Sequence, residues 1–372
     1  MKISVVKNNL LHAVSALSPI VPTKSTITAL YNILLEASSD EGGCLKLVAT
    51  DLDISLSHKI KATVEKEGAI TIPAKKLGEI LRELPDSPVG IEQVDEKVKI
   101  NCAKSNFILP SLPRSDYPIF PTKSFEGAFK VDNQMLRKLV NATSYATGRD
   151  EERQILKGLL WEISPDEMAM ISTNGHRLAK MSCSTEVKVD QARNVVVPPK
   201  ALEMVEKLCT EDGQVEVVID DNHLGIREGN TVIFSRLIEG NYPNYEQVIP
   251  FHNKMVAIID SEKMVEALRR MLILANTVTH RVRLKFSENS VNLSVKTEDL
   301  GEGDEAIDAD YQGDPLEIYF NGSYLIDMLK YNESDQVKIC MQTSESGILA
   351  VPAAENEKQR YLNVIMPLKV TE

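Results

Sequence analysis

The chain has 372 residues and a net charge of −12, and 43% of its residues are hydrophobic and 26% charged. This composition excludes an extended disordered chain, and the length predicts two to three domains. No apolar run approaches the ~18 residues of a membrane span, and five widely spaced cysteines without a CxxC pair predict reduced thiols in a cytoplasmic protein.

The predicted elements recur three times in the same order along the chain. Each copy begins with an amphipathic helix whose apolar residues follow the 3.6-residue period. We expect these helices over residues 7–19, 133–148 and 261–275, with Asn133 and Ser261 as N-caps of the second and third.

Two strands follow each of these helices, and the second strand of each pair ends in a turn that contains a threonine. The strand pairs are expected over 32–36 and 47–51, 159–163 and 170–174, and 281–286 and 293–298. The corresponding threonines are Thr50, Thr173 and Thr297, which are 123 and 124 residues apart. A shared period at several landmarks indicates a repeated domain.

A second, shorter helix follows in each copy, over 73–84, 198–208 and 321–330. Proline near the start of the first two suits the first turn of a helix, where its missing N–H is not needed. More strands then close each copy, and the first two copies end at Tyr117-Pro118 and Tyr242-Pro243, 125 residues apart. We therefore expect three tandem domains, over residues 1–122, 123–251 and 252–372.

Motifs of catalysis are lacking. The sequence has no GxxxxGK[ST] loop, HExxH, GxSxG or kinase signature, and His176 has no nucleophile beside it in sequence. Asp51-Leu52-Asp53 and Asp220-Asp221-Asn222-His223 could be drawn as metal ligands, but their spacing fits neither an EF-hand nor a zinc site, and turn chemistry explains both. We expect a protein that is not an enzyme and has no cofactor.

Positive charge is concentrated in the predicted helices. Together these six segments carry +5, so the rest of the chain carries −17. If the helices share one side, that side would attract a phosphate backbone while the rest repels it. Solvated helix faces are the alternative explanation. Sparse Lys and Arg without interleaved aromatic residues favour sequence-independent contact with a duplex.

Six segments in this order, on a threefold repeat, form a specific pattern: Lys24-Ser25-Thr26, Ala49 to Asp53, Thr173 to Ala179, Tyr242 to Tyr245, Phe320 to Tyr324 and Val364 to Leu368. With this pattern the chain resembles the bacterial DNA polymerase III β subunits, the sliding clamps, over essentially its whole length. The resemblance implies an α+β fold of three DNA-clamp domains, each with two helices packed on antiparallel sheets. It also implies a head-to-tail homodimer that closes into a ring around DNA and increases the processivity of a polymerase.

The resemblance also implies a groove that binds peptides of partner proteins. Its residues are mostly apolar or small, as a groove for the hydrophobic anchors of a peptide requires. The predicted groove residues are Leu156, Thr173, Gly175, His176, Arg177, Leu178, Pro243, Val248, Asn321, Tyr324, Val364, Met366, Pro367 and Leu368. The run Val364–Leu368 can equally be read as an edge strand of the third domain. The chain departs from the family pattern at Asn174, Gln247, Thr279 and the final Thr371-Glu372. These departures bear on which peptide motifs the groove prefers.

The resemblance also implies a subunit interface and a DNA-contacting set. Lys75, Lys104 and Phe107 of the first domain would face Ile273, Leu274, Glu298 and Glu302 of the third domain of the other subunit. The residues expected at DNA are Lys24, Arg137, Arg149, Arg153 and Lys200.

The implied partners are double-stranded DNA, a second copy of the chain, the replicative polymerase's catalytic subunit, the clamp loader, and other polymerases and repair proteins, with no membrane. Two other classes stay open on the residues alone. One is a peptide-binding scaffold that never encircles DNA, and the other is an enzyme with its site at a domain boundary.

Overall fold

The computed structural model describes residues 1–121, 123–149, 152–187, 189, 191–208, 212–354, 356 and 358–369. Thr122, the expected first domain end, and the terminal Thr371 and Glu372 lie outside these ranges. The chain forms two compact units, Met1–Gln134 with Lys200–Leu237 and Met135–Pro199 with Ile238–Glu372. Each unit is described by itself below.

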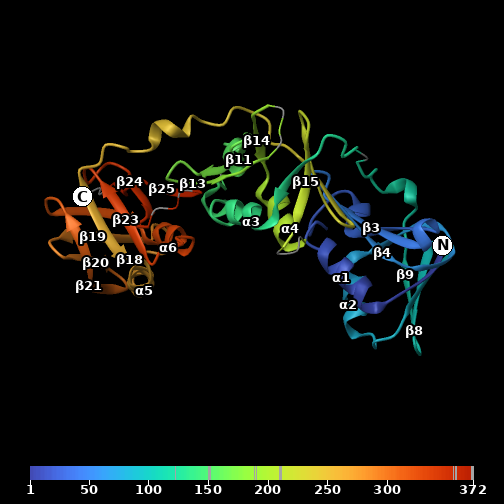
Figure 1. Ribbon diagram of the computed structural model, residues 1–372. Helices are drawn as coiled ribbons and strands as arrows, with labels where there is room; N and C mark the ends of the chain where they lie inside the picture. The colour runs from blue at the N-terminus through green and yellow to red at the C-terminus, as the bar shows by residue number, and fades with distance from the viewer. Residues whose placement is uncertain are drawn as a thin grey trace. The chain divides into compact units, whose positions relative to one another are not determined.

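The first unit contains two antiparallel sheets, and strands β3, β4, β8 and β9 are labelled in Figure 1. The strand orders are β5-β1-β7-β8-β9 and β10-β15-β16-β17-β4-β3-β2-β6. The strands are β1 (Lys2–Val5), β2 (Asn32–Ser38), β3 (Cys44–Thr50), β4 (Ile54–Lys61), β5 (Thr63–Lys66), β6 (Gly68–Pro73), β7 (Val89–Val94), β8 (Lys97–Cys102), β9 (Ser105–Pro110), β10 (Phe129–Asp132), β15 (Gln214–Ile219), β16 (His223–Glu228) and β17 (Thr231–Arg236). Helices α1 (Lys7–Leu17) and α2 (Ala74–Glu83) pack on each other, and α1 also contacts β3 and β4.

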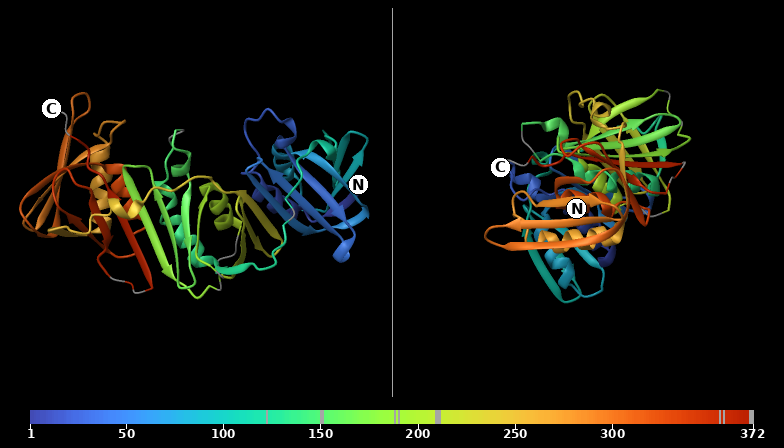
Figure 2. Two further views of the ribbon diagram at one scale, coloured as in Figure 1. Left: turned by 90° about the horizontal axis from the view of Figure 1, so that it is seen from above. Right: turned by 90° about the vertical axis from the view of Figure 1, so that its left-hand side faces the viewer.

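The second unit is built on one twelve-stranded sheet, with the order β14-β11-β12-β13-β25-β24-β23-β18-β21-β20-β19-β22. Its strands are β11 (Leu159–Ile163), β12 (Glu167–Thr173), β13 (Arg177–Ser184), β14 (Arg193–Val197), β18 (Met255–Asp260), β19 (Arg281–Ser287), β20 (Ser290–Thr297), β21 (Gly301–Gln312), β22 (Leu316–Asn321), β23 (Gln336–Met341), β24 (Ile348–Pro352) and β25 (Gln359–Ile365). Helices α5 (Ser261–Leu272) and α6 (Gly322–Lys330) pack on each other and against these strands (Figure 2).

Two further helices, α3 (Asn133–Asn141) and α4 (Pro199–Leu208), contain two of the three points at which the chain passes from one unit to the other, and the third lies between Leu237 and Ile238. Among the described residues the six α-helices fall within the predicted segments, and Thr50, Thr173 and Thr297 end β3, β12 and β20, as the repeat predicts. The observed helices still carry a net charge of +5. Every described helix is too short to cross a membrane.

Four helices end earlier than expected. Helix α5 ends at Leu272 instead of residue 275, and α2 ends at Glu83 instead of residue 84. The other two, α1 and α3, end beside a side-chain hydroxyl. Helix α1 stops at Leu17 instead of residue 19, and α3 stops at Asn141 instead of residue 148. After each end a hydroxyl bonds the carbonyl oxygen four residues back, from Ser18 to Val14 at 2.7 Å and from Thr143 to Leu139 at 2.6 Å. Such side-chain hydrogen bonds compete with further helical turns, so the apolar period overestimates the length of these two helices.

The predicted N-cap of the third long helix is wrong. Ser261 is the first helical residue of α5, and the carboxylate of Asp260 accepts from the Lys263 amide at 2.9 Å. Ser261 Oγ instead contacts the carbonyl oxygen of Ser334 and the side-chain amide of Asn332. The second predicted cap, Asn133, is likewise the first residue of its helix, α3.

The boundaries between the copies are crossed by continuous β-ladders. Strand β17, the last of the second copy, pairs with β4 of the first copy from Thr231↔His58 to Ser235↔Ile54. Strand β25, the last of the third copy, pairs with β13 of the second from Arg177↔Ile365 to Cys183↔Gln359. The second copy is therefore divided between the two units, because each half is hydrogen-bonded to a different neighbour.

Replacing Asp260 by alanine should destabilise the third copy, because the first turn of α5 loses its side-chain acceptor. We expect the apparent melting temperature to fall by about 2 °C, measured by differential scanning calorimetry. Asp260→Asn is the matched control, since asparagine caps as well as aspartate, and it should melt with the unchanged protein. Equal melting of the alanine variant would contradict the capping role.

Candidate functional site

The turn between β12 and β13 carries several of the predicted groove residues. Thr173 Oγ1 accepts from the amide of Gly175 at 3.1 Å and donates to the carbonyl oxygen of Arg177 at 2.7 Å. Asn174 Oδ1 accepts from the amides of His176 and Arg177, both at 3.0 Å. Gly175 has φ +87°, which favours glycine, so two polar side chains and one glycine fix this turn.

The same turn closes the equivalent strands of the first copy. Thr50 Oγ1 accepts from the amide of Leu52 at 3.0 Å, and Asp51 Oδ1 accepts from that of Ile54 at 2.8 Å. In the second candidate metal motif, Asp220 Oδ1 likewise accepts from the amide of His223 at 2.8 Å. The turn interpretation of both acidic motifs is confirmed, and the described residues contain no group of three metal-ligating side chains.

Strands β13 and β25 bring the second and third copies together at this turn. Leu178 lies opposite Val364, and the amide of Met366 donates to the carbonyl oxygen of His176 at 2.8 Å. The interpretation of residues 364–368 as part of an edge strand is wrong, because β25 lies between β13 and β24 and ends at Ile365. Met366 leaves the sheet with its side chain exposed.

Helix α6 presents its first turn to the same place. Asn321 Oδ1 caps the helix by accepting from the amides of Ser323 and Tyr324, at 3.0 and 3.4 Å. Asn174 Nδ2 donates to the hydroxyl of Tyr324 at 3.4 Å. The turn of the second copy and the helix of the third are thereby joined by side chains 150 residues apart.

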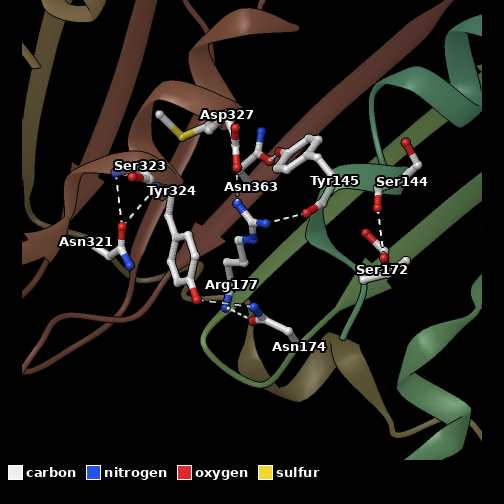
Figure 3. A network of polar contacts seen from close by, with 12 residues as sticks. Ser144, Tyr145, Ser172, Asn174, Arg177, Asn321, Ser323, Tyr324, Asp327 and Asn363 are labelled. Atoms are coloured by element: carbon white, nitrogen blue, oxygen red, sulfur yellow. Dashed lines mark hydrogen bonds and ion pairs between the residues drawn. The ribbon is translucent and has the colours of Figure 1, made fainter. Parts of the chain in front are cut away.

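Arg177 lies at the centre of a polar network at this junction (Figure 3). Its guanidinium lies between the rings of Tyr145 and Tyr324, with the carbon 5.1 and 4.3 Å from the two centroids. Nη1 donates to Asp327 Oδ2 at 2.6 Å, and Nη2 donates to the carbonyl oxygen of Tyr145. The guanidinium is held from two directions.

Two apolar members of the predicted set lie in one core cluster of the second unit. Leu178 and Val364 are buried in it together with Tyr245 and Ile249. Leu156 is buried, Val248 is exposed beside Ile249, and Pro243 is also exposed. The amide of Leu368 donates to the carbonyl oxygen of Tyr319 at 2.7 Å, and Pro367 is half-buried.

Four residues of the junction were not predicted from the sequence: Tyr145, Asp327, Tyr361 and Asn363. The Tyr145 hydroxyl contacts that of Tyr361 at 2.9 Å and donates to Asn363 Oδ1. Burial raises the pKa of Tyr145 well above its usual range and that of Tyr361 to about 12, so both phenols are neutral donors at pH 7. Only Asp327 had a sequence signal, its spacing of three residues from Tyr324 on one helix.

A cavity of about 1000 Å³ lies near the other end of β25. Its lining includes Lys138, Met181, Tyr331 and Tyr361 and none of the predicted groove residues. The cavity is therefore a separate feature from the predicted groove.

The residues expected at DNA are divided between the units. Lys24 and Lys200 are exposed in the first, and Lys200 pairs with Asp51 at 2.7 Å. In the second unit Arg149 is exposed and Arg137 half-buried. Arg153 lies against the β12–β13 turn and donates to the carbonyl oxygen of Asn174 at 3.4 Å, so it is grouped with the groove residues.

The residues expected at the subunit interface also fall in two groups. Lys75, Lys104 and Phe107 are exposed on the first unit. On the second unit Ile273 is 75% exposed, Leu274 is half-buried, and Glu298 and Glu302 are exposed.

Comparison with known proteins matches this architecture along the whole chain. The N-terminal, central and C-terminal domains of the DNA polymerase III beta subunit match residues 1–121, 130–244 and 246–369. The beta sliding clamp of Pseudomonas putida is 31% identical, with both chains covered completely.

Two solved clamps, from Pseudomonas aeruginosa and Bartonella birtlesii, both bound to griselimycin, share 29% and 28% identity with this chain. They have TM-scores of 0.91 and 0.93 over the full length of both chains.

The fold and these similarities define a sliding clamp of three tandem clamp domains, a non-catalytic processivity factor of DNA replication. The chain belongs to the DNA polymerase III beta subunit family.

Replacing Asn174 by alanine should loosen the β12–β13 turn, because the amides of His176 and Arg177 lose their acceptor. We expect hydrogen exchange in a peptide covering residues 173–178 to accelerate about fivefold, measured by mass spectrometry. Asn174→Asp keeps the accepting oxygen and should exchange at the original rate. Unchanged exchange in the alanine variant would show that the turn does not depend on this side chain.

Proposed function

We propose that two copies of this chain close head to tail into a ring that encircles duplex DNA without sequence specificity. The ring tethers the replicative polymerase and other DNA-acting proteins. The observation that carries the proposal is a pairing rule that recurs at both copy boundaries. The strand after the threonine turn of one copy pairs with the last strand of the next, as in β4 with β17 and β13 with β25.

Applied to the ends of the chain, the rule leaves two strands without their expected partners. Strand β21 follows the threonine turn of the third copy. Within the part of the chain that the structure describes, its residues 301–308 pair with β20 alone, and residues 309–312 pair with β18. Strand β9 is the last of the first copy and lies at the edge of its sheet. We propose that β21 pairs with β9 of the other subunit, because unpaired edges recruit strands.

The side chains around these two strands are complementary. Phe107 is exposed on β9, with Lys104 at the preceding turn. Ile273 is exposed near β21, whose residue Glu302 is also exposed. Opposite charges around an apolar centre suit a head-to-tail contact that closes a ring.

At each copy boundary a side-chain contact accompanies the strand pairing and follows the same rule. Asp51 of the first threonine turn pairs with Lys200 at the start of α4, and Asn174 of the second contacts Tyr324 at the start of α6. The residue after Thr297 is Glu298, and the start of α2 carries Lys75. We propose a Glu298–Lys75 ion pair between subunits.

For DNA contact we propose Lys24, Arg137, Arg149 and Lys200, with Arg153 as the weakest member because it contacts the groove turn. The helices carry a net charge of +5 in a chain whose net charge is −12. This distribution supports a ring lined by helices that attract phosphate, with an exterior that repels it. Loose contacts suit a collar that must slide, and tethering raises the effective concentration of the polymerase at its template.

For partner proteins we propose a peptide groove made of the predicted residues around Arg177, Leu178, Tyr324 and Met366. The clamps of Pseudomonas aeruginosa and Bartonella birtlesii bind griselimycin. We propose that griselimycin binds this protein in the peptide groove around Arg177, Leu178, Tyr324 and Met366. The proposed partners are the polymerase catalytic subunit, the clamp loader, and other polymerases and repair proteins with clamp-binding peptides.

We further propose a cytoplasmic location, which the free Cys44, Cys102, Cys183 and Cys340 support. The domain boundaries near 122 and 251 are also proposed here. The seams of the three family matches, between residues 121 and 130 and between 244 and 246, support them.

Replacing Ile273 and Leu274 together by glutamate should convert the dimer into a monomer. Two charges would enter an apolar contact beside Glu302, and we expect the dimer dissociation constant to rise at least about a hundredfold. Native mass spectrometry at micromolar concentration measures the result. Ile119→Glu, at another exposed apolar position, should stay dimeric; a dimeric double variant would contradict the interface.

A closed ring should be retained on DNA by topology. Protein loaded onto a nicked circular plasmid should stay bound during gel filtration and be lost once a restriction enzyme linearises the circle. Equal retention on both forms would contradict encirclement. A chain that is monomeric yet binds griselimycin would favour a scaffold that never surrounds DNA.

A further inference from the structure

We infer that Asp327 and Tyr145, neither of which belongs to the predicted groove set, are positioning residues. They fix Arg177 and, through it, orient Tyr324 for partner binding. The inference rests on the proposed function, because it concerns the affinity of the groove for its occupant.

The burial of Arg177 makes its partners necessary. Its side chain is 11% exposed, whereas that of Asp327 is 42% exposed. A guanidinium removed from water must be paired or hydrogen-bonded. Asp327 Oδ2 at 2.6 Å and the carbonyl oxygen of Tyr145 meet this need at Nη1 and Nη2, whereas the buried Nε has no hydrogen-bond partner among the described residues.

Helix α6 contacts Arg177 through two side chains. Tyr324 and Asp327 are three residues apart, so they lie on one face of the helix. The ring of Tyr324 lies 4.3 Å from the guanidinium carbon, within the range of a cation–π contact. The carboxylate thus holds the cation on which the Tyr324 ring rests (Figure 3).

Tyr145 can hold the other side of Arg177 because it is itself fixed. Its ring is stacked on that of Tyr331, with centroids 5.5 Å apart and planes at 10°. Its hydroxyl contacts Tyr361 and Asn363 on β25. Arg177 is therefore held between a segment anchored on β25 and the helix that carries Tyr324.

The consequence for binding follows from the position of Tyr324 and the turn. Tyr324 is bonded to Asn174, whose Oδ1 also holds the amides of His176 and Arg177. Loss of the Asp327 charge would weaken the hold on Nη1 of the Arg177 guanidinium. The Tyr324 ring that packs on this guanidinium would then be less fixed. Residues predicted to line the groove would then be less preorganised, which lowers affinity without removing a contact to the ligand.

The test is isothermal titration of the full-length protein with griselimycin. Asp327→Asn, which keeps size and one oxygen but removes the charge, should raise Kd about fivefold; the effect is modest because Asp327 is partly solvated. Asp327→Glu keeps the charge and should bind within about twofold of the unchanged protein. Glu288→Gln is the matched control, an exposed acid at the β19–β20 turn, and should not alter Kd.

A double-variant cycle separates positioning from general stability. In a Tyr324→Ala background, Asp327→Asn should have little further effect on Kd, because the ring that Asp327 orients is gone. An unchanged Kd for Asp327→Asn, or an equal loss with and without the Tyr324 ring, would overturn the inference. If the unchanged protein does not bind griselimycin, the proposed groove itself is refuted, and this inference falls with it.

Discussion

Main-chain pairing between the copies is the interaction on which the rest of the structure depends. At each boundary the strand that follows the threonine turn of one copy joins the last strand of the next. Because these ladders are as continuous as those inside a copy, the central copy has no sheet of its own and contributes to both compact units. A repeated domain with one donor strand and one acceptor strand leaves one of each unused at its ends, and the proposed ring closure would use this pair.

The repeat sets the position of the candidate site, and divergence between the copies gives it its chemistry. Both turns use a threonine hydroxyl and a following Asp or Asn oxygen to hold backbone amides. In the first copy Leu52 takes the position with φ +81°, and Asp51 pairs with Lys200. In the second copy glycine takes the equivalent position, and Asn174 bonds a tyrosine of the next copy. The first junction is closed by an ion pair, whereas the second carries an exposed turn surrounded by aromatic and apolar side chains.

Local patterns in the sequence were sufficient for the helices, the strand pair at each threonine turn and the repeat, because apolar period and turn chemistry act over a few residues. The helix ends at Leu17 and Asn141 were missed, since each depends on a hydroxyl beyond the helix that bonds a carbonyl oxygen four residues back. The cap at Asp260 was missed, since it depends on which of two neighbouring side chains reaches the Lys263 amide. The groove residues came from resemblance to a family. The network around Arg177 could not be predicted, because it joins side chains 32 to 218 residues apart, and only pairing of β13 with β25 brings them together.

The energetics of that network favour a role in specificity over one in stability. A buried guanidinium pays a desolvation cost that a half-solvated carboxylate offsets only in part. An apolar residue at position 177 would fill the space between Tyr145 and Tyr324 without that cost, and the β13–β25 ladder would remain. An apolar residue could not fix the Tyr324 ring and its helix in one orientation, because dispersion contacts have no preferred direction. The hydrogen bonds from Arg177 to Asp327 and Tyr145 are directional. The charged residue at this junction therefore defines the shape of the surface that the ladder has brought together.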